Sequence, residues 1–153
     1  MAVRIAAIII ISAMSLVFMT GSSFCQEAGM EGLVDRYVKY TDLQRTQADK
    51  EYPGKKMDVE GIVSDVGEGK TFDVANDIER VYYTVTTDVV KTPAGNAYRA
   101  ILVYKDIKRV EGIDRGQKIS FSGNIIRVVD EKLYISVWLS ADELTPEERA
   151  LFK

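Results

Sequence analysis

The chain contains no histidine, only one cysteine, one tryptophan and three prolines among its 153 residues. Histidine is the commonest general base and a frequent ligand of transition metals, so its absence argues against most hydrolases and against imidazole-bound metal centres. A single cysteine cannot form a disulfide within the chain, so the core alone has to stabilise the fold. Positive charge is not in excess, since 20 basic residues face 23 acidic ones. Bulk electrostatics therefore do not draw the chain to nucleic acid or to an anionic membrane.

The N-terminus has the organisation of a secretory signal. Arg4 supplies one positive charge, residues 5–18 are almost wholly apolar, and small and polar residues follow at 20–23. This order predicts a signal peptide over residues 1–25 that is cut after Cys25. We therefore expect an exported protein of the periplasm or cell envelope of a bacterium, with a net charge of −3 that becomes −4 when Arg4 is removed.

Two alternatives remain for this segment. Cleavage after Cys25 would give a mature chain that starts at Gln26. Cleavage after Ser22 or Ser23 fits the same pattern. A lipid on Cys25 would instead anchor the protein to a membrane, but Phe24 stands where lipoprotein processing requires a small residue. The apolar stretch is shorter than the ~20 residues of a permanent membrane helix.

Beyond the signal, the pattern predicts one domain over residues 26–153. A helix is expected over about 31–51, because helix formers dominate there until Pro53 and Gly54 end it. A short C-terminal helix is expected after Thr145, which begins a capping box with Pro at the first helical position. A further short helix fits between 105 and 117, and residues 67–80 are expected to form a loop in which 71–74 could be a short strand.

Between the helices, alternating or β-branched segments predict five strands. Met57, Val59 and Val63 are expected to face the core, and Gly61 marks a bulge or bend that lets the first strand serve both halves of the sheet. In the third strand Ala100 is expected to point inward, although both sides of that strand are apolar. The predicted strands are 55–66, 81–90, 97–104, 118–128 and 133–139.

Five strands with a helical element between the third and the fourth is the order of the OB fold. The expected fold class is therefore mainly β, a five-stranded OB-fold barrel over about 55–140 with the N-terminal helix packed on it. Other small all-β arrangements fit the same pattern.

Two stretches resemble a known family. The first runs from the predicted helix into the first strand and carries the residues Ala48, Tyr52, Gly54, Lys55, Gly61 and Val63. The second is the run Gly116-Gln117-Lys118-Ile119, followed by Phe121 and Gly123. Together they resemble the tRNA-anticodon-like (tRNA_anti-like) OB-fold proteins exported by bacteria, over roughly residues 30–140. The resemblance implies the fold, export and no enzymatic activity, and its name reflects fold similarity without establishing tRNA binding.

The outward face of the barrel is the candidate ligand-binding surface. Its candidate residues are Tyr82, Thr84, Thr86, Arg99, Tyr134 and Trp138. Tyr134 and Trp138 could offer an aromatic platform to a peptide or a sugar, but we favour the interpretation that they pack under the N-terminal helix. Single-stranded nucleic acid is disfavoured, because Asp58 and Glu60 beside this face would repel phosphates.

No catalytic residue, metal site or cofactor is predicted. Five carboxylates lie between residues 65 and 79, but their spacing does not match a calcium-binding loop, so a solvated acidic loop is expected. The sequence thus predicts a non-catalytic binding or adaptor module of the envelope, with a protein, peptide or small molecule as its partner. Binding of single-stranded nucleic acid or oligosaccharide is the alternative, and contact with a membrane is expected only if the N-terminus is retained or lipidated.

Overall fold

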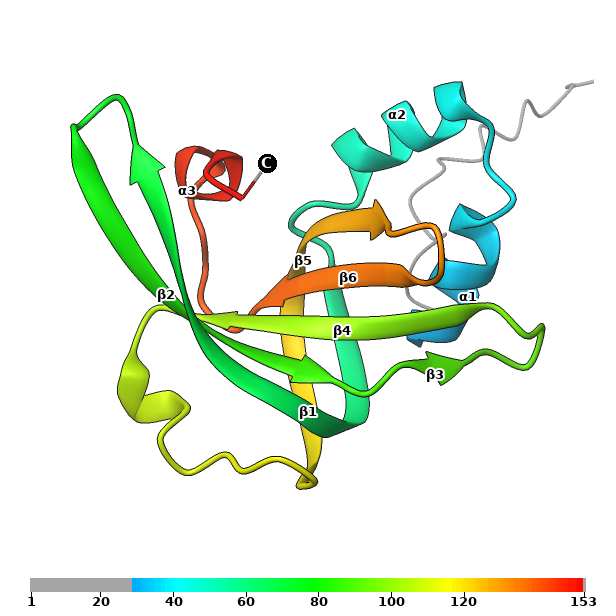
Figure 1. The fold of residues 1–153 in the computed structure, drawn as a ribbon. Coiled ribbons are helices and arrows are strands. Elements are labelled where there is room, and N and C mark those ends of the chain that lie inside the picture. The colour runs from blue at the N-terminus through cyan, green and yellow to red at the C-terminus, as the bar shows by residue number, and fades with distance from the viewer. Residues whose placement is uncertain (1–28, 153) are drawn as a thin grey trace, which may run out of the picture.

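The computed structural model describes residues 29–152, and the expected signal peptide with its cleavage site lies outside them. The fold is mainly β (Figure 1). Along the chain its elements are α1 (Gly29–Tyr37), α2 (Asp42–Glu51), β1 (Lys56–Asp73), β2 (Ile78–Thr87), β3 (Val90–Lys91), β4 (Ala97–Tyr104), the 3₁₀ helix η1 (Ile107–Arg109), β5 (Lys118–Asp130), β6 (Ile135–Ser140) and α3 (Pro146–Ala150).

The six strands form one sheet that closes into a ring. Their order is β2-β1-β5-β6-β4-β3, and an additional pairing of β2 with β4 joins the two sides. All pairings are antiparallel except that of β4 with β6, which is parallel. Closure removes most of the open sheet edges that would otherwise invite pairing with another chain.

Successive side chains of a strand point to opposite faces of the sheet, and those on the inner face fill the interior of the ring. Met57, Val59 and Val63 of β1 are buried, as the sequence predicted. β4 is buried on both sides, since Ala100 and Leu102 join the core cluster while Ile101 and Val103 are covered on the outer side. Leu133, expected in the last strand, is instead exposed in the turn before β6.

β1 serves both halves of the sheet, as predicted, but the irregularity lies after Gly61. Residues 56–62 pair with β5, and from Val63 onward the strand pairs with β2. The register shifts between Val63 and Asp65, where β1 passes from one partner to the other. At Gly61 a Cβ atom would lie 2.9 Å from the Thr87 methyl group, so glycine is needed there for close packing.

The prediction that residues 67–80 form mainly a loop is wrong. β1 continues to Asp73 and β2 begins at Ile78, so the two strands form a long hairpin that extends beyond the ring beside α3 (Figure 1). Cross-strand ion pairs stabilise it, because Lys70 and Arg80 each lie within 3.0 Å of a carboxylate on the opposite strand.

The sequence predicted one helix over residues 31–51, but the structure has two helices there, α1 and α2. Thr41 is the N-cap of α2, and its capping box with Gln44 starts a new helix. α1 buries an apolar face in the core cluster, whereas only Ala48 is buried in α2. The single proton of the Tyr37 hydroxyl is shared between two acceptors, a carboxylate oxygen of Asp49 in α2 at 3.3 Å and the Val128 carbonyl at 3.4 Å. Burial raises the pKa of Tyr37 to about 12.

The C-terminal helix is confirmed with the cap that the sequence predicted. The Thr145 hydroxyl accepts a hydrogen bond from the backbone N–H of Glu148, Pro146 opens the helix, and the Glu148 carboxylate returns to the backbone N–H of Thr145. The short helix expected between the third and fourth long strands is present as the single turn η1.

Candidate ligand-binding face

β6 lies between β5 and β4, and its outward side chains form the candidate site. Ile135, Val137 and Leu139 point into the core cluster, so Ser136 and Trp138 point outward. Tyr134, directly before the strand, continues the outward row. Alternate residues of a strand are roughly 6.6 Å apart, so these three side chains form a line along the outer surface.

Two arginines from the neighbouring strands lie over this line. Arg99 of β4 pairs in register with Ser136, donates a hydrogen bond from Nε to the Ser136 hydroxyl at 3.3 Å, and lies 4.6 Å from the centre of the Tyr134 ring. Arg127 of β5 pairs with Trp138 and lies 4.5 Å from the centre of its ring. Cation–π contacts of this kind orient the guanidinium groups. We call Arg99, Arg127, Tyr134, Ser136 and Trp138 the β6 face.

The charge on the β6 face is not neutralised within residues 29–152. Four other arginines form ion pairs with aspartates, whereas Arg99 and Arg127 have no carboxylate partner among the described residues. Nε of Arg127 and Nε1 of Trp138 are moreover shielded from solvent and lack a hydrogen-bond acceptor in this part of the chain. A partly desolvated guanidinium without a counter-charge attracts an anion more strongly than a solvated one.

The ring brings three of the six sequence-predicted site residues together. Arg99, Tyr134 and Trp138 belong to the β6 face. Thr84 and Thr86 also point outward, but they lie on β2, with β4 between them and β6. Asp58 and Glu60 pair with β5 residues 122 and 120 on another side of the ring.

Tyr82 lies apart from the β6 face. Its ring covers Gly69 on the neighbouring strand and meets the ring of Phe152 edge-on, with the ring centres 5.0 Å apart. The C-terminal segment that carries Phe152 also accepts a hydrogen bond from Thr71, through the Leu151 carbonyl. Tyr82 is therefore used to dock the C-terminus onto the hairpin.

The interpretation that Tyr134 and Trp138 pack under the N-terminal helix does not match the structure. Neither ring belongs to the core cluster into which α1 packs, and each lies against an arginine instead. Among the described helices, none is drawn over β4 and β6 on the side that faces the viewer in Figure 1. On that side arginines rather than a helix cover the two rings, and of the outward side chains of β6 only Trp138 is partly exposed.

Sequence reasoning missed Arg127 and Ser136. Arg127 stands alone among the apolar residues 125–129, and a lone charge in such a run is a usable signal. Its orientation was hidden because the register of β5 shifts between Ile125 and Arg127, which interrupts the alternation. Ser136 gave no signal, because it is one of many serines.

The carboxylates between residues 65 and 79 lie along the β1–β2 hairpin. Asp65, Asp73 and Glu79 form ion pairs, and hydrogen bonds from Asn76 and then Arg80 hold the pKa of Asp73 below its usual range. Across residues 29–152, no group of three or more metal-binding side chains is close enough to hold an ion. None of the helices described for this chain is long and apolar enough to cross a membrane.

Comparison of the chain with known proteins identified no relative. No protein-family model, curated protein or solved structure matches the chain. The resemblance to the tRNA-anticodon-like OB proteins therefore stays a prediction from residues 48–63 and 116–123.

Proposed function

We propose that the protein is an exported, non-catalytic binding module of the OB type, and that its β6 face binds an acidic peptide segment of a partner protein. The OB assignment is supported by the five long strands of the ring and by the helical turn η1 between β4 and β5. Non-catalytic binding is supported by the lack of histidine and by the candidate site itself, which offers cations and aromatic rings.

The observation that carries the proposal is the pair of stacked arginines without a carboxylate partner in the described chain. A guanidinium presents several N–H donors in a plane that matches a carboxylate or a phosphate. Arg99 and Arg127 flank β6, two strand spacings of about 4.8 Å apart and offset along the strands, so they can engage two acidic groups of one extended chain.

Peptide carboxylates are favoured over the phosphates of nucleic acid. The mature chain has a net charge of −4, which repels a long polyanion with many phosphates more strongly than a short peptide, and the two cations of the β6 face match only a few acidic groups. One face of each aromatic ring already carries a guanidinium, so less ring surface remains on which a base could stack. An oligosaccharide would meet the same obstacle.

Binding is tested by fluorescence anisotropy with an alternating Glu/Ala octapeptide, its Gln/Ala counterpart and an oligothymidylate. We expect the Glu/Ala peptide to bind best, because only its carboxylates match the arginines. A hydrogen bond to a charged group contributes about 1.5–3 kcal/mol, so Arg99→Gln and Arg127→Gln should each weaken binding by about tenfold or more. The interaction should also weaken as salt shortens the Debye length below ~10 Å.

Arg115→Gln is the matched control, because the Arg115 side chain is 74% exposed, pairs with Asp65 and lies outside the β6 face. It should leave binding unchanged. Equal binding of the Gln/Ala peptide, or unaltered affinity in both arginine variants, would refute the role of the β6 face. Tighter binding of the oligothymidylate would replace the peptide with nucleic acid.

Export is tested separately by the intact mass of the protein made in a bacterial host. The apolar segment 5–18 and the small residues after it support a mature chain that starts at Gln26. We expect that mass in the periplasmic fraction. An acylated Cys25 or a retained Met1 in the membrane fraction would contradict the proposed cleavage.

A further inference from the structure

Arg149 of α3 carries a guanidinium that acts on Glu147 only at a distance, since hydrogen bonds to Glu147 and then this charge lower the pKa of Glu147. Its guanidinium lies against the backbone of Gly54, where an added Cβ would be 2.8 Å from Nη1. Gly54 has φ +87°, so the turn favours glycine there, and the missing side chain leaves room for the guanidinium. No ion pair or hydrogen bond joins the Arg149 side chain to another residue in 29–152.

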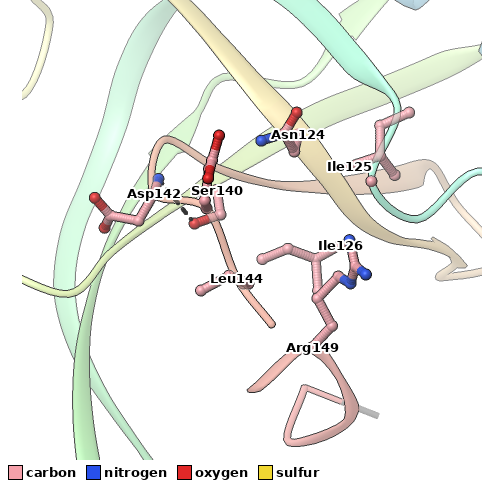
Figure 2. A pocket seen from close by; sticks show the side chains of 9 residues that line it. Asn124, Ile125, Ile126, Ser140, Asp142, Leu144 and Arg149 are labelled. Atoms are coloured by element: carbon pink, nitrogen blue, oxygen red, sulfur yellow. Dashed lines mark hydrogen bonds between the residues drawn. The ribbon is translucent and has the colours of Figure 1, made fainter. Parts of the chain in front are cut away.

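A polar cavity of about 280 Å³ opens beside this guanidinium (Figure 2). Asn124 and Ser140, which pair across β5 and β6, line it together with Asp142. The charge of Asp142 is balanced by an ion pair with Arg109 at 2.8 Å, and its carboxylate also accepts a hydrogen bond from the backbone N–H of Lys105 at 3.0 Å. Glu143 at the rim is exposed to solvent, which screens its charge. The cavity therefore offers a ligand one free cation and an amide.

A second cavity, of about 430 Å³, adjoins the first. It lies between α2, β5 and α3, and both cavities are lined by Ile126 and Arg149. Most of its remaining lining is apolar and includes Pro53, Val128 and Phe152, while Asp49 and Arg127, the latter shared with the β6 face, also line it. We call the two cavities together the Arg149 groove. One end of this groove is polar and cationic, and the other is apolar.

We infer that the Arg149 groove binds an anionic amphiphile, an alkyl carboxylate of the fatty-acid type. The carboxylate would accept hydrogen bonds from Arg149 and Asn124, and the alkyl chain would pass Ile126 into the apolar cavity. A groove that is mostly apolar with a few convergent polar groups is the usual form of a small-ligand site. The free guanidinium supplies the charge complementarity that selects an anionic head over a neutral one.

The site is tested by isothermal titration of the full-length mature protein with decanoate, octanoate and decanol, each below its aggregation limit. Each methylene that is buried should strengthen binding by up to about fourfold, so decanoate should bind more tightly than octanoate. Decanol, which lacks the charge, should bind at least about tenfold more weakly than decanoate. Arg149→Gln should weaken decanoate binding by a similar factor and leave decanol binding unchanged.

Arg115→Gln is again the control of equal charge change, and it should bind decanoate as the unaltered protein does. Amide chemical shifts of the unaltered protein give a measurement that does not depend on a variant: decanoate should move the signals of Gly54, Asn124 and Ala150. Absence of decanoate binding, equal affinity for decanol, or shifts confined to other parts of the molecule would each overturn the inference.

Discussion

Replacing Leu102 with alanine is expected to lower the free energy of unfolding by about 3–5 kcal/mol. The Leu102 side chain is fully buried and stands in register between Val85 of β2 and Leu139 of β6, which are also fully buried. Truncation there leaves a cavity at the place where β4 joins the two sides of the ring. A domain of this size has only about 5–15 kcal/mol of stability, so the midpoint of urea unfolding should fall sharply.

Leu133→Ala provides the comparison, because it removes the same atoms from a side chain that is 84% exposed. Its effect should stay within about 0.5 kcal/mol. Similar losses in the two variants would mean that the interior of the ring is not packed as described.

The second large effect is expected from Gly123→Ala in β5. The added Cβ would lie 2.7 Å from the backbone carbonyl oxygen of Ser140 and would also collide with the Phe121 ring. A backbone oxygen cannot move aside as a flexible side chain can, so β5 and β6 would have to separate. Overpacking of this kind costs about 1–3 kcal/mol, measurable as a lower midpoint in thermal or urea unfolding.

Gly112→Ala is the matched control, because an added Cβ at Gly112 meets nothing within 4 Å and its backbone is not left-handed. That substitution should be neutral or stabilise the protein by up to about 1 kcal/mol, since it restricts the unfolded chain. Equal behaviour of the two glycine variants would argue against the close contact of β5 with β6.

Period-two patterns predicted the strands well because burial enforces them residue by residue. The inward positions 57, 59 and 63 of β1 are buried as expected, and β4 spans the predicted residues 97–104. The capping box at Thr145 was equally readable, because a cap depends on side chains within one turn.

Features that depend on distant partners were not readable. The outer part of the hairpin contains Gly67, Gly69 and several charges, which locally favour a loop, yet pairing across to residues 78–84 makes it a strand. The break between α1 and α2 was missed because residues 38–41 carry no proline or glycine. Packing of α1 into the core and the cap at Thr41 together override helix propensity there.

Only part of the candidate site was predictable from the sequence, because the rest depends on partners that are distant along the chain. Alternation placed Tyr134 and Trp138 on one side of their strand, and Arg99 on the outer side of another. Which residues become neighbours depends on the register of β6 against β4 and β5, and the sequence does not specify this. The Arg149 groove depends even more on tertiary structure, because α3 has to dock before Arg149 reaches Gly54.

The parallel pairing of β4 with β6 has a consequence for the order of events during biosynthesis. β6 is the last strand of the chain, and it joins both β5 and β4, so the interior stays open until residue 140 has left the ribosome. At ~5–20 residues per second, the earlier strands wait for seconds with unpaired edges. The export that we propose for this chain requires an unfolded polypeptide, and late closure of the ring favours that state during synthesis.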